Sequence, residues 1–155
     1  MTADPRAEQI TDIWLQSIRL FFRLQAMGKE LGAVSANNSS TWGFLHTLVT
    51  VGPSTVPEIA RMRPVSRQHI QTMANEMATE GLIRFIENPR HKRSKLLEAT
   101  DKGRAFYDEN AAAMLVEAST MTGNLNTEDL EVTKAVLKEL QAALAARQEA
   151  VQDIP

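Results

Sequence analysis

Apolar residues in this chain recur mainly at helical spacing, in segments separated by Gly, Pro and Asn/Ser-rich breaks. The first segment, from about residue 7 to residue 31, carries two adjacent apolar stripes instead of one. The first stripe is Ile13, Leu20, Leu24, Met27 and Leu31, and the second is Ile10, Trp14, Ile18, Phe21 and Phe22. A helix that is apolar over more than half of its circumference has two surfaces to bury, and one short chain rarely covers both. We therefore expect part of this helix to pack against a second subunit.

Two shorter helices follow, and each carries local signals for its ends. The pattern from Thr41 to about Val51 predicts the second helix, which a Gly-Pro pair ends. Residues 55–58, Thr-Val-Pro-Glu, form a capping box, in which the Thr hydroxyl and the Glu carboxylate each accept from an amide of the first turn. The third helix should be short, because Pro64 ends it near Met62.

A fourth helix is predicted from Arg67 to about Glu80, between a Ser66 N-cap and a Gly81 that suits the C-terminal end. Its two faces differ sharply in chemistry. The stripe expected to be buried is Ile70, Met73, Ala74 and Met77. The opposite face is polar and uncharged, and consists of Gln68, Gln71, Thr72 and Asn75.

The second half of the chain predicts a hairpin and two long helices. Two β-like runs, Leu82–Glu87 and Ser94–Ala99, flank residues 88–93, so the hairpin has a basic tip. A fifth helix should follow over residues 100–121, and a sixth over residues 126–151. The near-heptad spacing of leucines in the sixth helix makes it a candidate for pairing with another helix.

Composition removes several classes of protein. The chain has 155 residues, enough for one compact domain, and its lack of Cys excludes disulfides, thiolate zinc sites and cysteine nucleophiles. His46, His69 and His91 fall in three different elements without metal-ligand spacing, so no metal or other cofactor is expected. Neither a signal peptide nor an apolar run of membrane-spanning length occurs, and we expect a cytoplasmic protein without a membrane partner.

Charge is distributed unevenly along the chain, although the formal total is only −2. Between Arg61 and Arg104 there are ten basic and five acidic residues, a net charge of +5. The remainder holds seven basic and fourteen acidic residues, a net charge of −7. The average therefore hides a basic segment that could attract a polyanion.

The order of elements in the basic segment suggests what it binds. A short helix, a tight turn, a second helix with a polar outer face and a hairpin with a basic tip together suit duplex DNA. The second helix fits the major groove, where amides pair with adenine edges and Arg with guanine. The hairpin tip offers cations to phosphates or to a narrow minor groove. A solvated surface would explain each feature separately, but the ordered set favours DNA binding.

The residues from Thr41 to Phe106 resemble the winged-helix core of the MarR family of bacterial transcription regulators. Six short stretches, taken in order and spacing, carry the resemblance, while none is decisive alone. They are Trp42-Gly43-Phe44-Leu45, Thr55-Val56-Pro57-Glu58-Ile59-Ala60, Val65-Ser66-Arg67-Gln68-His69-Ile70, Glu80-Gly81-Leu82-Ile83, Asn88-Pro89-Arg90-His91-Lys92-Arg93-Ser94-Lys95-Leu96 and Ala99-Thr100-Asp101-Lys102-Gly103.

The resemblance implies a mainly α (α+β) fold in a single domain over residues 1–155. A winged helix-turn-helix core at residues 40–103 would be flanked by long dimerisation helices at residues 7–33 and 104–151. The family pattern also implies a homodimer through the first, fifth and sixth helices, with two recognition helices in successive major grooves of a pseudo-palindromic operator. A small, often aromatic ligand commonly weakens DNA binding in this family, so we expect a repressor that such a ligand relieves.

The resemblance assigns DNA contacts residue by residue. The base-reading candidates are Arg67, Gln68, His69, Gln71 and Thr72, although His69 could instead only support the helix cap. Ser66 is assigned to a phosphate, and the wing candidates are Arg90, Lys92 and Arg93. The family's wing usually carries Asp near the places of Asn88 and His91, so this wing is more cationic and lacks the usual acidic partner for a wing Arg. Which basic residue of the wing enters the minor groove stays open.

A ligand pocket is less clearly marked. Arg19, Trp42 and His46 are its candidates. A solvated position explains Arg19 as well as a ligand contact does, and for His46 a satisfied interior position is favoured over a ligand contact. The aromatic residues at helical spacing favour plain core over a ligand pocket. They are Trp14, Phe21, Phe22, Trp42 and Phe44.

No catalytic constellation is present, and we expect no enzyme. Ser66 and His69 share a helix turn, but nothing acidic is placed to orient the His, and capping explains the Ser. Two other functions remain open beside DNA binding. One is a winged-helix protein-interaction module that does not bind DNA, and the other is a small-molecule binding protein without a DNA role. The charged segment favours DNA, since protein-docking helices more often expose aromatic or aliphatic anchors.

Overall fold

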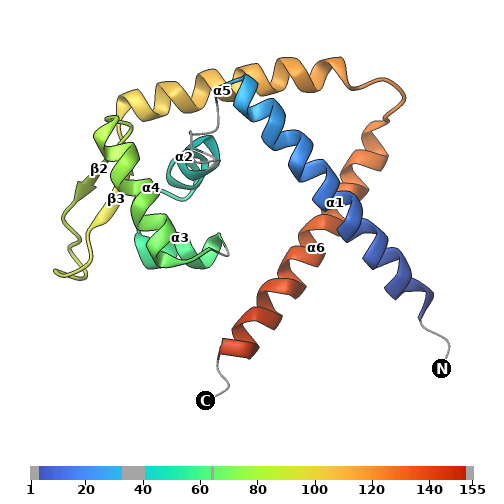
Figure 1. The fold of residues 1–155 in the computed structure, drawn as a ribbon, viewed down its shortest axis with the longest axis horizontal. Coiled ribbons are helices and arrows are strands. Elements are labelled where there is room, and N and C mark those ends of the chain that lie inside the picture. Colours follow the sequence, from blue (N-terminus) through green and yellow to red (C-terminus); the bar gives the residue numbers. More distant parts are fainter. Residues whose placement is uncertain (1–3, 33–40, 64, 153–155) are drawn as a thin grey trace. The chain divides into compact units, whose positions relative to one another are not determined.

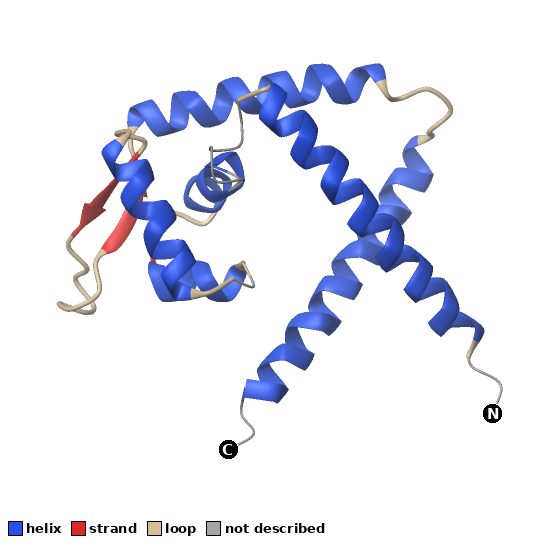
Figure 2. Ribbon diagram, in the orientation of Figure 1, coloured by secondary structure: helices blue, strands red, loops and turns tan. Residues whose placement is uncertain are grey.

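The computed structural model describes residues 4–32, 41–63 and 65–152. The predicted loop at residues 37–40 and the predicted helix stop at Pro64 lie outside them. The elements are α1 (Pro5–Glu30), α2 (Thr41–Thr50), β1 (Ser54–Thr55), α3 (Val56–Met62), α4 (Arg67–Thr79), β2 (Ile83–Ile86), β3 (Leu96–Ala99), α5 (Asp101–Thr120) and α6 (Thr127–Gln152) (Figure 1). Strands make up only a small part of a mainly helical chain (Figure 2), which confirms the predicted mainly α fold.

The chain divides into two units, residues 1–114 and residues 115–155. The first unit contains α1 to β3 and the beginning of α5, and the second contains the end of α5 and α6. A long amphipathic helix needs a second surface against which to bury its apolar side. The short helices and strands of the first unit provide such surfaces for one another and form a core.

The first unit contains a three-stranded antiparallel sheet in the order β1-β3-β2. Pairs of the hairpin register include Ile83 with Ala99 and Phe85 with Leu97, close to the predicted pairing of the two runs. β1 was not predicted, because two residues are too short to show the alternation of a strand. Ser54 pairs with Leu97, so β3 has a partner on both sides.

The stripe of α4 is buried as predicted. Ile70 and Ala74 are fully buried, and Met73 and Met77 nearly so, against α2, α3 and the sheet. Figure 1 shows α4 between α3 and the β2–β3 hairpin, both of which it contacts. Because one face of α4 is fixed in the core, its opposite face must point outward. Gly81, with φ +75°, ends the helix as predicted, since a left-handed conformation there favours glycine.

Helix α1 starts two residues earlier than the predicted Ala7. The Asp4 carboxylate accepts a hydrogen bond from the Arg6 amide at 2.9 Å, and Pro5 occupies the first helical position. An Asp cap followed by Pro is a standard start signal, because Pro has no N–H to leave unpaired there. The prediction was wrong here because the apolar pattern, which begins only at Ile10, does not reach the cap.

The capping box of α3 is present as predicted. The Glu58 Oε2 atom accepts from the backbone N–H of Thr55 at 2.7 Å and from the Thr55 hydroxyl at 2.7 Å. The backbone hydrogen bond and then the hydroxyl bond hold the pKa of Glu58 below its ordinary value, and the charges of Arg61 and Arg90 lower that pKa further. The ionised carboxylate of Glu58 thus stabilises the first turn of α3.

The start of α5 packs closely against Leu82, the residue directly before β2. Thr100 accepts from the Gly103 amide at 3.0 Å and donates to the carbonyl of Gly81 at 2.7 Å, which confirms it as the cap. A Cβ on Gly103 would stand 2.0 Å from the carbonyl oxygen of Leu82 and 3.3 Å from a Leu45 methyl. Only glycine fits this approach of helix to strand.

Several long helices leave apolar side chains uncovered in the single chain. On α1 the exposed set includes Trp14, Phe21 and Phe22, so the expectation that these aromatics are core is wrong for the chain by itself, whereas Phe44 is fully buried. In the second unit the exposed set includes Leu115, Val116, Leu130 and Leu144. None of the described helices combines the length and hydropathy needed to cross a membrane.

Gly103→Ala should lower the free energy of unfolding by about 1–3 kcal/mol or more, because the added methyl overlaps backbone. Ala is otherwise the better helix former, so helix propensity alone predicts the opposite sign. Chemical denaturation at fixed protein concentration measures the change. Ala105→Gly on the exposed side of α5 is the control, with an expected loss of about 1 kcal/mol. A stabilised Gly103→Ala would contradict the described packing.

Glu58→Gln should lower the free energy of unfolding by about 0.3–1 kcal/mol near neutral pH, because the charge at the helix start is lost. The folded-state pKa of Glu58 is below its ordinary value, so its contribution is present above the ordinary pKa and disappears as pH falls through the folded pKa. Urea unfolding of both proteins from about pH 7 to about pH 3 should show the difference shrinking toward zero. A difference that grows with acid would contradict this account.

Candidate nucleic-acid interface

The N-terminal turn of α4 is capped by Ser66, whose Oγ accepts from the His69 amide at 3.1 Å. Ser66, Arg67, Gln68 and His69 are all exposed. The hydroxyl hydrogen of Ser66 and the free N–H groups of the first turn can therefore meet an anion together. The structure places the side chain of His69 at the surface and involves only its amide in the cap.

Two internal hydrogen bonds order the outward face of α4. The Gln71 Nε2 donates to Asn75 Oδ1 at 3.0 Å, and the Thr72 hydroxyl donates to the Gln68 carbonyl at 3.0 Å. All four residues are exposed, as predicted for the polar face. Asn75 was not among the predicted contact residues, although its i, i+4 spacing from Gln71 is the spacing at which helix side chains meet.

Local hydrogen bonds shape the tip of the β2–β3 hairpin. Asn88 Oδ1 accepts from the Arg90 amide at 3.0 Å, and the Asn88 carbonyl accepts from the His91 amide at 3.2 Å. The Ser94 amide donates in turn to the His91 carbonyl at 3.1 Å. The side chain of Asn88 thus closes the turn in the manner usual for Asn and Asp. The departure from Asp at this position leaves the turn intact while removing a negative charge.

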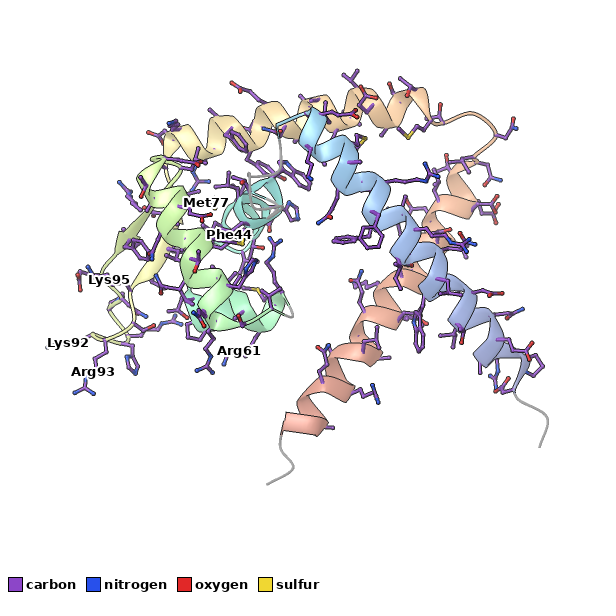
Figure 3. All side chains as sticks on the ribbon, viewed as in Figure 1. Phe44, Arg61, Met77, Lys92, Arg93 and Lys95 are labelled. Atoms are coloured by element: carbon purple, nitrogen blue, oxygen red, sulfur yellow. The ribbon has the colours of Figure 1, made fainter. Side chains whose placement is uncertain are left out.

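The cations of the hairpin tip are exposed. Over the described ranges no ion pair involves Arg90, Lys92 or Arg93. Figure 3 shows Lys92 and Arg93 extending from the tip away from the helices, with Lys95 nearby on the same hairpin. Arg84, farther from the tip, is different, because its Nε donates to Glu98 on the facing strand at 2.6 Å. The positive charge available to a ligand is therefore concentrated at the tip.

Two further basic residues, Arg61 and Arg63, belong to the end of α3 and were not among the predicted contacts. Arg61 is exposed, and Arg63 is half-buried at the helix C-cap, where desolvation lowers its pKa. The charges of Arg61 and Arg90 both act on Glu58, so α3 and the hairpin tip share one electrostatic neighbourhood.

These residues provide three features: a helix face of uncharged polar side chains, a capped helix start, and a hairpin tip whose cations form no ion pair among the described residues. The arrangement can bind phosphates electrostatically at its edges and form directed hydrogen bonds at its centre. Among the described residues no group of three or more His, Asp and Glu side chains could hold a metal ion.

The ligand-pocket candidates are only partly brought together. Trp42 stacks on His46 with ring centroids 5.5 Å apart and on Tyr107 at 5.6 Å. His46 Nδ1 lies 3.0 Å from the Tyr107 hydroxyl, so His46 is satisfied, but it is exposed and the favoured interior position is wrong. Tyr107 belongs to α5, and nothing in the sequence near His46 could have indicated this partner.

Two buried polar atoms near these rings have no hydrogen-bond partner. They are Nε1 of the half-buried Trp42 and Oδ1 of Asn110, which lies one helical turn beyond Tyr107 on α5. Asn110 is more than nine-tenths buried, and its Nδ2 donates to the Phe106 carbonyl at 2.9 Å. Orphaned buried groups are costly and often mark a place for a ligand or water. Arg19 is exposed on α1, and no hydrogen bond or ion pair among the described residues joins it to these rings.

Comparison with known families and structures agrees with this geometry. Residues 38–94 match the model of the MarR family, a range that includes α2 to the hairpin tip. The chain is 29% identical over 108 residues to the HTH-type transcriptional regulator TcaR of Staphylococcus aureus, which covers 68% of each chain.

Solved structures show the same fold. A MarR protein from Peptoclostridium difficile superposes with a TM-score of 0.73 at 15% identity, covering 97% of both chains. The PcaV transcriptional regulator from Streptomyces coelicolor, solved in complex with its natural ligand, gives a TM-score of 0.69 at 17% identity, covering 93% of this chain and 99% of its own.

Proposed function

This chain belongs to the MarR family of winged-helix transcription regulators, and from that premise we propose that it is a homodimeric repressor that a small aromatic ligand releases from its operator. It is a DNA-binding regulator and not an enzyme. The observation that carries the proposal is the exposed amide face of α4 beside the free cations of the hairpin tip. A helix of this kind fits the major groove while flanking cations hold the backbone.

The proposed DNA contacts divide by chemistry. Ser66 and the first amides of α4 bind a phosphate, while the base-reading side chains extend from the outward face of α4. The base-reading set is Arg67, Gln68, His69, Gln71 and Thr72. The wing set is Arg90, Lys92 and Arg93, which bind the backbone or a narrow minor groove. Arg61, which is exposed in the last turn of α3, is a further proposed phosphate contact.

A homodimer is supported by the apolar side chains that a single chain leaves uncovered on its long helices. We propose that a second copy covers them through α1, α5 and α6, in one domain over residues 1–155 with the DNA-binding core at residues 40–103 and dimerisation helices at 7–33 and 104–151. A two-fold axis through these helices places two α4 helices on a pseudo-palindromic operator. Such a regulator acts in the cytoplasm, where the DNA is.

The release step is proposed at the stacked rings of Trp42, His46 and Tyr107. A planar molecule with an acceptor for Trp42 Nε1 and a donor for Asn110 Oδ1 would satisfy both orphaned atoms. Arg19 can supply a counter-charge if the ligand is a carboxylate. The presence of a natural ligand in the related PcaV structure supports this type of regulation.

Lys92→Ala should weaken binding to all duplex sequences and reduce the slope of log affinity against log salt by about 0.9 per subunit, because one phosphate contact is lost. Fluorescence anisotropy with fragments from beside the gene, at several salt concentrations, measures both. Lys138→Ala, which removes an exposed cation from α6, is the matched control and should leave the slope unchanged. If wild-type protein bound no duplex at low salt, the proposed function would be wrong, and a protein-interaction module would be favoured instead.

Trp42→Phe keeps an aromatic ring but removes the indole N–H, so it should weaken ligand-induced release without changing the affinity for DNA in the absence of ligand. A single hydrogen bond of this kind is worth about 0.5–1.5 kcal/mol, so its loss should weaken ligand binding by up to roughly tenfold. Hydroxybenzoates serve as probes, and the concentration for half-release of bound DNA is the readout. An unchanged response to a hydroxybenzoate that releases wild-type protein would contradict the assigned site.

A further inference from the structure

Gln71 and Asn75 act as one amide pair on the outward face of α4, joined by the hydrogen bond from Gln71 Nε2 to Asn75 Oδ1. We propose that this pair reads an adenine in the major groove and that Thr72 contacts the methyl group of a neighbouring thymine. This inference rests on the proposed DNA-binding function. Each half-site of the operator then carries A·T base pairs opposite this part of α4.

The hydrogen bond within the pair determines what it can still offer. It consumes one donor hydrogen of Gln71 and a lone pair of Asn75. It leaves the Gln71 Oε1 as an acceptor, the Asn75 Nδ2 as a donor and the second hydrogen on Gln71 Nε2. Exchanging the nitrogen and oxygen in both amides reverses the roles, yet still leaves one free carbonyl and one free amino group. The pair therefore keeps one free carbonyl acceptor and one free amino donor in either arrangement.

Adenine is the purine complementary to that edge. Its N6 amino group donates and its N7 accepts, whereas guanine presents two acceptors, O6 and N7. At a guanine the free carbonyl of the pair would face O6 without a hydrogen between them, and a desolvated acceptor left in this way is costly. The amide pair therefore discriminates between the two purines.

Thr72 lies next to this pair in sequence and has a different surface to offer. Its hydroxyl donates to the Gln68 carbonyl at 3.0 Å, so that hydrogen is used within the helix. The remaining apolar group of the side chain is its methyl, and contact with the thymine C5 methyl is a recognised mode of reading. The two observations agree on A·T base pairs.

The pair is also held in place before it meets DNA. Ile70 and Ala74, each next to one amide residue in sequence, are fully buried and fix the rotation of α4. The hydrogen bond between the amides limits the rotamers of two exposed side chains. Less conformational entropy is then lost when both contact a base.

The test begins with selection of duplexes from a pool with a randomised central segment, using the full chain. Wild-type protein should enrich A·T at a defined position in each half-site. Replacing that adenine by 7-deazaadenine, which lacks the N7 acceptor, should lower affinity on the order of 5- to 150-fold. The same replacement at an adenine outside the half-sites is the control and should have no effect.

Gln71→Ala and Asn75→Ala should each abolish the adenine preference at that position, and the double variant should lose little more than either single one, because the two amides act as a unit. Ala is a strong helix former, so α4 is not weakened. Gln141→Ala, the same change on exposed α6, is the matched control and should keep the full preference.

The outcomes separate this inference from the function on which it rests. Retained, salt-dependent duplex binding with no enriched adenine, or with an adenine preference that survives both single variants, overturns the amide-pair reading alone. The inference is also overturned if wild-type protein enriches G·C at this position and Gln71→Ala abolishes that preference. Absence of any duplex binding by wild-type protein overturns the regulator function itself.

Discussion

Burial of one face of α4 is the constraint on which the rest of the first unit depends. Ile70 and Ala74 are completely removed from solvent, so the helix cannot rotate without exposing them. Full burial of an aliphatic side chain such as Ile70 is worth about 1.5–3 kcal/mol, more than any single surface contact on the opposite face. The core therefore decides which polar residues of α4 point outward, and we propose that these outward residues contact DNA.

The charges of the hairpin follow a similar division between structural and available groups. Arg84 is paired with Glu98 across the two strands, whereas the cations of the tip have no partner among the described residues. Hydrogen bonds from Thr55 favour the ionised form of Glu58, and the nearby positive charges of Arg61 and Arg90 lower its pKa further. The unpaired positive charge of the hairpin is therefore concentrated at its tip, which is the part that we propose binds the DNA backbone.

The local features of this fold could be predicted from the sequence, and the tertiary ones could not. The caps of α3, α4 and α5 and the stripe of α4 depend on neighbours within a few residues, and all are confirmed. The strand β1 is too short to have a pattern of its own, and it exists only because β3 has an edge to pair with. The predicted interior position of His46 was wrong because helical periodicity shows which face of a helix a residue lies on, but not whether another element covers that face. Its partner Tyr107 becomes a neighbour of Trp42 and His46 only through folding. The predicted contacts of α4 and of the wing tip stay predictions, although both sets are exposed.

We propose that the outward face of α4 and the hairpin tip form the surface that meets DNA. The chain has no Cys, so one introduced cysteine can carry a photo-crosslinking label at a single known place. Labels at Gln68→Cys on α4 and at Lys92→Cys on the tip should both crosslink to a bound duplex, whereas a label at Gln141→Cys on α6 should not. Crosslinking from Gln141→Cys in place of the other two positions would contradict the account.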